Sequence, residues 1–441
     1  MNKYILFLGI IFLTYGAGAQ KTTLKFNFND RSEKLQIQIG DEKIYIEPGK
    51  KGKATYKAKI TSPQYIKILR IPSRPELLYV YPNDKLEVSI AGPNYGDLEF
   101  KGKNAALNAY LVDPKSIVLG GGLNFDEAGY TDFLKAKVEE RIANLKSLGF
   151  TQDFIEKEQK RIAVKIYTSM VGYPNIRRRT ERGYKASEFY YGFVNDKIFE
   201  NEEMLFLNEY TDFIQYMYNM MATKDIVKYD AFTYAETTLN YVINNVKSEK
   251  IKAHLINYYA YDYLKRNGIL KVDPITKVFK TYVKDPAHIE NYNNTWETWS
   301  KITPGRVMPD FTFYDINDKA IPLSSLKGKY IYIDVWATWC KPCIAEIPNL
   351  KKMEHEMKGK NIVFVSISTD KDSAAWKKML VKDNFTGIQW HTRSREFSND
   401  LMIVSIPRFI LIDPQGKMVD ANVSRPNRPE TYQLMETLPG L

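Results

Sequence analysis

The sequence predicts a multidomain chain with three parts: an N-terminal antiparallel β domain, a central α-helical domain and a C-terminal α/β domain. Three observations lead to this prediction. The chain has 441 residues, which is too many for a single hydrophobic core. Apolar residues alternate with polar ones up to about residue 103, and they follow helical spacing from there to about residue 300. Beyond that point, short apolar runs alternate with helical patterns, which is typical of an α/β sheet.

The first 19 residues are predicted to form an export signal. Lys3 supplies a positive charge, and the stretch from Tyr4 to Tyr15 is apolar but too short to span a bilayer. Ala17-Gly18-Ala19 matches a small-x-small cleavage pattern, so we expect cleavage near Ala19 and a soluble mature protein without a transmembrane anchor, located in the periplasm. No cysteine follows the apolar run, so a lipoprotein anchor is not expected.

The composition is that of a soluble globular protein, with 44% hydrophobic and 26% charged residues. The formal net charge of +11 favours attraction to acidic partners or anionic membrane surfaces. No zinc-finger or RNA-binding strand motif accompanies this charge, so we expect no nucleic-acid partner.

Residues 20–103 are predicted to form the β domain. Apolar residues alternate with polar ones in three stretches, as in half-buried strands. These are Leu24, Phe26 and Phe28; Leu35, Ile37 and Ile39; and Leu86, Val88 and Ile90. Turn signals such as Pro48-Gly49 and Pro82-Asn83-Asp84 separate the strands.

Residues 104–300 are predicted to form the helical domain. One helix is expected to start near Thr131 and to stop at Gly149, and Thr151 and Ser187 are expected to cap the next two. Three further helices are predicted at 230–247, 248–267 and 274–284. The role of this domain and of the β domain is not indicated by any catalytic motif.

Residues 301–441 are predicted to form the α/β domain. Strands are expected at 311–313, 330–335, 362–367, 408–412 and 417–419. Helices are expected at 340–358, 373–381 and 430–438. The run from 330 to 335 is almost entirely apolar, as in a central strand that is buried on both faces.

The two cysteines of the chain lie three positions apart, in Trp339-Cys340-Lys341-Pro342-Cys343. They come where a buried strand is predicted to give way to a helix. A helix N-terminus offers free N–H groups and the positive end of its dipole, and both stabilise a thiolate. We therefore expect Cys340 to be the nucleophile and Cys343, one turn further on and more buried, to resolve the mixed disulfide. Lys341 adds positive charge, and Pro342 suits a first helical turn.

The segment from Asp334 to Cys343 resembles the active site of the thioredoxin superfamily. Met308-Pro309-Asp310-Phe311 and Leu326-Lys327-Gly328-Lys329 resemble the TlpA- and ResA-like branch of envelope thiol-disulfide oxidoreductases. The resemblance covers 303–441, about a third of the chain, and implies a thioredoxin-like fold. It also implies an enzyme that needs no cofactor beyond its redox-active disulfide.

The resemblance assigns roles to further residues. Asp334 corresponds to the buried acid that moves a proton on or off the second cysteine, and burial is expected to raise the pKa of its carboxyl. Glu346, one helical turn after Cys343, corresponds to a glutamate near the disulfide; a solvated helix residue is the alternative. The lysine that usually faces the buried acid is replaced by Ser366, so water or Glu346 is left to complete the proton path.

Ile406-Pro407 precedes a predicted strand, where thioredoxin-like proteins carry a cis-proline that faces the disulfide. We expect a cis peptide bond there. The backbone of Ile406 would then bind an extended substrate strand, beside Trp339, Lys341 and Pro342.

Neither a zinc site nor a structural disulfide fits the cysteine pair as well. Structural zinc needs four ligands, and the only histidines are scattered at His254, His288, His355 and His391, so no metal site is expected. A structural disulfide over so short a loop adds little stability. An envelope binding or adaptor protein, whose redox domain is regulatory or an oxidant, is the main alternative to an enzyme.

The resemblance favours a reductase of protein disulfides. Its expected partners are disulfide-containing exported proteins and a membrane thiol-disulfide carrier that supplies electrons. The sequence selects neither the substrates nor the oligomeric state.

Overall fold

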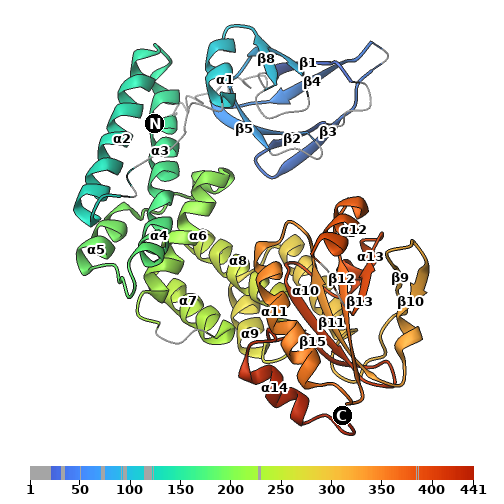
Figure 1. Cartoon of the computed structure of the whole chain (residues 1–441). Coiled ribbons are helices and arrows are strands. Elements are labelled where there is room, and N and C mark those ends of the chain that lie inside the picture. Colours follow the sequence, from blue (N-terminus) through green and yellow to red (C-terminus); the bar gives the residue numbers. More distant parts are fainter. Residues whose placement is uncertain are drawn as a thin grey trace, which may run out of the picture. The chain divides into compact units, whose positions relative to one another are not determined.

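The computed structural model describes residues 21–30, 35–49, 51–70, 75–90, 92, 97–113, 122, 124–226, 230–383, 385 and 387–441. The predicted export signal lies outside these residues. The chain divides into two compact units, Met1–Met221 and Ala222–Leu441 (Figure 1). The division falls inside the stretch 104–300, which the sequence predicts to be one helical domain. The boundaries of that domain stay a prediction.

In the described residues of the first unit up to 101, eight strands form two four-stranded sheets. The first sheet has the order β4-β1-β7-β8 and the second the order β3-β2-β5-β6. The strands are β1 (Lys21–Phe28), β2 (Leu35–Ile39), β3 (Glu42–Ile46), β4 (Lys53–Lys59), β5 (Gln64–Arg70), β6 (Glu76–Val80), β7 (Lys85–Ile90) and β8 (Leu98–Lys101).

The predicted alternation fills the core between the two sheets. Leu24, Phe26, Ile37 and Val88 are fully buried in one hydrophobic cluster that draws on both sheets. The described strand pairs of this domain are antiparallel, as predicted, with one exception: β1 and β7 run parallel. Five strands separate these two in the chain, and a parallel pair requires such a long connection.

Helices complete the first unit. They are α1 (Ala105–Val112), α2 (Glu127–Ser147), α3 (Gln152–Thr168), α4 (Gly172–Thr180), α5 (Glu188–Lys197) and α6 (Asn208–Thr223), and the unit boundary lies near the end of α6. The predicted N-cap of α2, Thr131, lies five residues after the observed one. Asp126 caps this helix by accepting a hydrogen bond from the Gly129 N–H, and the Thr131 hydroxyl instead bonds the Ala128 carbonyl. The predicted end is confirmed, because Gly149 has a φ of +69°.

The second unit begins with four helices, α7 (Ala231–Asn245), α8 (Glu249–Asn267), α9 (Asp273–Tyr282) and α10 (Pro286–Ser300). The first three are within a few residues of their predicted bounds, and α10 was not predicted. Two contacts join these helices to the sheet that follows. The Arg408 guanidinium lies 5.9 Å from the centre of the Trp299 ring, and the Asn422 side chain donates to the Arg266 carbonyl at 3.2 Å.

Among the described residues that follow α10, seven strands form a mixed sheet in the order β10-β9-β13-β12-β11-β14-β15. Its strands are β9 (Thr312–Tyr314), β10 (Ala320–Pro322), β11 (Tyr330–Trp336), β12 (Ile362–Ser368), β13 (Ile388–His391), β14 (Arg408–Ile412) and β15 (Met418–Val423). The helices in this part of the chain are α11 (Lys341–Glu356), α12 (Ser373–Lys382), α13 (Glu396–Asp400) and α14 (Pro429–Glu436). All seven residues of β11 are buried, as expected of a central strand.

The multidomain layout predicted from the sequence is confirmed: β-rich sheets, then helices, then an α/β domain. In the part of the chain that the structure describes, no helix combines the length and the apolar character needed to cross a membrane.

Candidate active site

Cys340 and Cys343 form a disulfide at the junction between β11 and α11. The two sulfur atoms are 2.05 Å apart and the two Cα atoms 5.2 Å apart. Cys340 occupies the N-cap of α11, and its sulfur accepts a hydrogen bond from the Cys343 N–H at 3.2 Å. The first cysteine therefore sits where the sequence predicted it, at the N-terminus of the helix that follows the buried strand.

The surroundings of the disulfide are exposed, although the cysteines are not. Trp339 is 70% exposed, and Lys341 and Pro342 are exposed in the first turn of α11. Cys340 and Cys343 keep 4% and 3% of their surface accessible. The predicted difference in burial between the two cysteines is thus very small in the disulfide form, because one S–S bond places both sulfurs against the same apolar cluster.

Tryptophan and phenylalanine side chains surround the disulfide with an apolar cluster. Trp336 and Trp376 are almost fully buried in one cluster with both cysteines. The Trp336 ring stacks on Phe385, with 5.2 Å between the ring centres. The end of β11 and the α12 residue Trp376 therefore pack against the redox pair.

Asp334 lies buried on β11, in register with Ser366 of the neighbouring strand β12. Burial raises the pKa of the Asp334 carboxyl from 3.8 to about 7, a hydrogen bond with the Ser366 side chain lowers it, and the charge of Glu346 raises it. The sequence predicted both the raised pKa and the serine at the position facing the acid.

A small cavity of about 20 Å³ adjoins this carboxyl. Its lining includes Asp334 and Ser366, and also Lys351 and Glu354 on α11. A space of this size holds one water molecule.

Glu346 is buried rather than solvated on α11, so the solvated alternative is wrong. Its carboxylate accepts from Arg425 Nη1 at 3.0 Å and from Asn349 Nδ2 at 3.0 Å. Arg425 lies 79 residues further along the chain and was not predicted. No local pattern pointed to it, because its partner is brought close only by the fold.

Ile406-Pro407 is a cis peptide bond, as predicted. Ile406 is partly buried and packs against the cluster that contains both cysteines. The proline segment therefore borders the disulfide, on the loop that leads into β14.

The Asp370 carboxylate anchors the loop between β11 and α11 through hydrogen bonds. The Asp370 carboxylate accepts from the Thr338 N–H at 2.9 Å, from the Thr338 hydroxyl at 2.8 Å and from the Ser368 hydroxyl at 2.8 Å. The Asp370 carbonyl lies 2.8 Å from His391 Nε2. These residues were not predicted. The Thr338 side chain, two positions before Cys340, was the one signal that could have indicated an anchor there.

Across the described ranges, no group of three or more histidine, cysteine, aspartate or glutamate side chains is arranged to hold a metal ion.

Comparison with known proteins places this site in a family. A family model described as thioredoxin-like matches residues 328–418. The thioredoxin-like protein YneN of Bacillus subtilis is 31% identical over 147 residues, which cover 32% of this chain and 74% of that relative. The thiol-disulfide oxidoreductase ResA of Bacillus cereus is 26% identical over 128 residues, which cover 29% of this chain and 74% of that relative.

A solved structure matches the same region. The thioredoxin domain of a thiol-disulfide oxidoreductase from Bacteroides vulgatus is 31% identical, with a TM-score of 0.28, and the match covers 30% of this chain and 96% of that one. The identity and coverage of the relatives confirm the resemblance seen in the sequence. The chain belongs to the thioredoxin-like family, and its C-terminal third is a thioredoxin-like oxidoreductase domain.

Proposed function

We propose that this protein is an exported thiol-disulfide oxidoreductase that reduces disulfides in other exported proteins through the Cys340–Cys343 dithiol. One observation carries the proposal: the two cysteines are bonded at the N-terminus of α11, next to an exposed tryptophan, and the strand that leads into this helix carries a buried acid. A helix N-terminus favours the thiolate, which is the attacking species in disulfide exchange.

The reaction takes two exchange steps. The Cys340 thiolate attacks one sulfur of the substrate disulfide, and the other substrate sulfur leaves as a thiolate that takes up a proton. The Cys343 thiol then gives up its proton and attacks the Cys340 sulfur, which releases the second substrate thiol. The substrate gains two electrons and two protons, and the chain ends as the disulfide. A membrane thiol-disulfide carrier would return two electrons to this disulfide in each cycle.

Asp334 is proposed to accept the proton of Cys343. With a pKa of about 7, its carboxyl exchanges protons near neutral pH, as a general base should. The cavity lined by Asp334 and Ser366 offers a place for a water that passes this proton toward Lys351 and Glu354. Glu346 is proposed to act on Asp334 through its charge, since Arg425 and Asn349 already bond its carboxylate.

Substrate binding is proposed on the rim of the disulfide. Trp339, Lys341 and Pro342 are exposed there, and Ile406-Pro407 borders the cysteines. An extended peptide could add to the backbone of Ile406 by β-strand pairing, which depends little on the peptide's sequence.

Insulin reduction tests the proposal. The wild-type protein should catalyse it in the presence of a thiol reductant. Cys340→Ser should abolish the activity, and Cys343→Ser should leave a trapped mixed disulfide. A wild-type protein without turnover would favour the adaptor alternative.

The direction of electron flow has its own test. We expect a reduction potential near that of thioredoxin, about −270 mV, whereas a potential near −120 mV would identify an oxidant. Export is tested by N-terminal sequencing of the protein from the envelope, and Gln20 is the expected first residue.

A further inference from the structure

The outward face of the sheet β4-β1-β7-β8 carries a concentration of positive charge. Side chains on each strand alternate between the core and solvent, so each strand presents every second residue outward. Seven lysines and two glutamates lie at these outward positions. We call this the lysine face: Lys21, Lys25, Lys53, Lys57, Lys59, Lys85 and Lys101, together with Glu87 and Glu99.

The register of the strands places like charges next to each other. Lys21 on β1 is directly opposite Lys59 on β4. Thr23, the next outward residue of β1, lies between Lys57 on one neighbouring strand and Lys85 on the other. Like charges that face each other across strands destabilise a sheet. Repulsion between these lysines therefore lowers the stability of the free protein. A negative charge bound over the face removes this repulsion.

The two glutamates of the lysine face lie on β7 and β8, so they offset positive charge only at that end of the sheet. Glu87 is in register with Lys25 and with Lys101. Strand β4, at the opposite edge of the sheet, carries three lysines and no acid. Within the described residues, none of the seven lysines forms an ion pair, whereas lysines on α2 and α8 do. No described residue therefore compensates the positive charge of the β4 edge.

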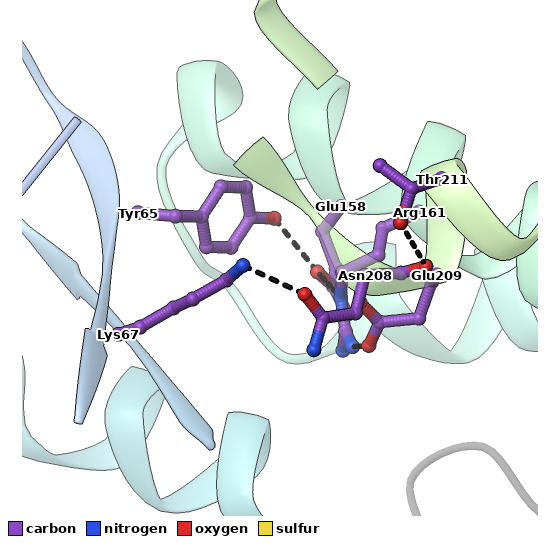
Figure 2. Close-up of polar contacts among 7 residues, drawn as sticks. All are labelled: Tyr65, Lys67, Glu158, Arg161, Asn208, Glu209 and Thr211. Atoms are coloured by element: carbon purple, nitrogen blue, oxygen red, sulfur yellow. Dashed lines mark hydrogen bonds and ion pairs between the residues drawn. The ribbon is translucent and has the colours of Figure 1, made fainter. Parts of the chain in front are cut away.

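The seven lysines are exposed, whereas the opposite sheet contacts helices of the same unit. Figure 2 shows these contacts. The Tyr65 hydroxyl on β5 donates to Glu158 of α3 at 2.8 Å, and Lys67 donates to Asn208 of α6 at 2.7 Å. Arg161 in turn forms a buried ion pair with Glu158. The second sheet is thus fixed against α3 and α6, and the first sheet presents its lysines to solvent.

We propose that the lysine face binds the anionic headgroups of a phospholipid bilayer. The remaining outward residues of the four strands are Thr23, Asn27, Thr55 and Ser89, so these positions hold no arginine, aromatic or large apolar side chain. Grooves for single-stranded nucleic acid use aromatic stacking, and protein interfaces use buried aromatic and arginine anchors. An array of lysine point charges without such anchors fits a surface that offers many equivalent negative charges, which is what an anionic membrane presents.

Vesicle sedimentation with the full chain tests the proposal. The protein should sediment with phosphatidylcholine vesicles that contain phosphatidylglycerol, and it should stay in solution with phosphatidylcholine alone. Binding should disappear at high salt, because the screening length falls from about 10 Å at 0.1 M to about 3 Å at 1 M.

A charge variant identifies the surface. The triple variant Lys57→Gln, Lys59→Gln and Lys85→Gln should bind anionic vesicles about 100-fold more weakly, since each lysine near such a surface contributes about fivefold. The control is Lys250→Gln, Lys358→Gln and Lys360→Gln, which removes the same charge from exposed positions in the second unit. This control should retain most of the wild-type affinity. Both variants should reduce insulin at the wild-type rate.

Three results would overturn the proposal. The first is equal loss of binding in the two triple variants, which would assign the effect to net charge alone. The second is salt-independent or equal binding to neutral vesicles, which would indicate insertion of the apolar N-terminal segment that every variant shares. The third is binding to DNA or to an acidic peptide without binding to anionic vesicles. Circular dichroism of each variant verifies the fold, and the salt series on the wild type needs no variant.

Discussion

Replacing Asp334 by asparagine should stabilise the oxidised protein at alkaline pH. The carboxyl is buried beneath the active site, and its pKa is about 7 in place of 3.8. At about 1.36 kcal/mol for each pKa unit, ionisation of this carboxyl in the folded protein lowers the free energy of unfolding by about 4 kcal/mol. Asparagine has the same shape, can still bond Ser366 and never ionises, so Asp334→Asn should recover this energy.

The pH dependence follows from the sign of the pKa change. Between about pH 4 and pH 7 the folded state holds a proton that the unfolded state has released, so wild-type stability falls as the pH rises through this range. The variant should lack this loss. The two proteins should therefore be equally stable near pH 4 and should differ by about 4 kcal/mol at about pH 8.

Urea unfolding followed by tryptophan fluorescence measures this difference. All six tryptophans lie in the stretch from Trp296 to Trp390, so the signal reports on the second unit only. Asp334→Glu serves as a control that keeps an ionisable carboxyl. A gain below about 1 kcal/mol at about pH 8, or the same pH dependence in wild type and Asp334→Asn, would refute the reasoning about this buried acid.

Three further substitutions probe the site. Arg425→Gln should cost about 1–3 kcal/mol, because the buried Glu346 carboxylate loses its ion pair, and the double variant with Glu346→Gln should recover most of the loss in urea unfolding. Thr338→Val should cost about 1.5–3 kcal/mol by removing the hydroxyl that donates to Asp370, while Thr338→Ser should cost less in the same assay. Trp376→Ala should cost about 3–5 kcal/mol by opening a cavity beneath the disulfide, measured by circular dichroism.

Each of these predictions has an outcome that contradicts it. Equal stability of Arg425→Gln and wild type would mean that solvent already satisfies Glu346. A serine variant as unstable as the valine variant would assign the role of Thr338 to its methyl group. A loss under about 1 kcal/mol for Trp376→Ala would mean that the cluster collapses around the gap.

The sequence predicted best what depends on neighbours in the chain. The central strand β11 was recognised by its unbroken apolar run, and the redox pair by its spacing at the start of the next helix. The alternation of apolar residues such as Leu24 and Phe26 predicted strands of the two N-terminal sheets, because a period of two residues is a property of a single strand.

Features that depend on distant parts of the chain were missed. Arg425 and Asp370 reach the active site from other elements, so no local spacing connects them with the cysteines. The parallel pairing of β1 with β7 likewise depends on the order in which strands enter the sheet. The start of α2 was misplaced for a local reason: both Asp126 and Thr131 are good caps, and only the fold selects the first.

The contacts of α8 and α10 with the redox sheet determine at which residue a truncated redox protein should begin. Trp299 is buried, and Arg408 from the sheet covers its ring. A fragment that starts at residue 303, where the family resemblance begins, would leave this arginine without its aromatic partner. Expression of the redox part alone should therefore begin ahead of α7, between 224 and 230, so that the truncated product keeps its own packing.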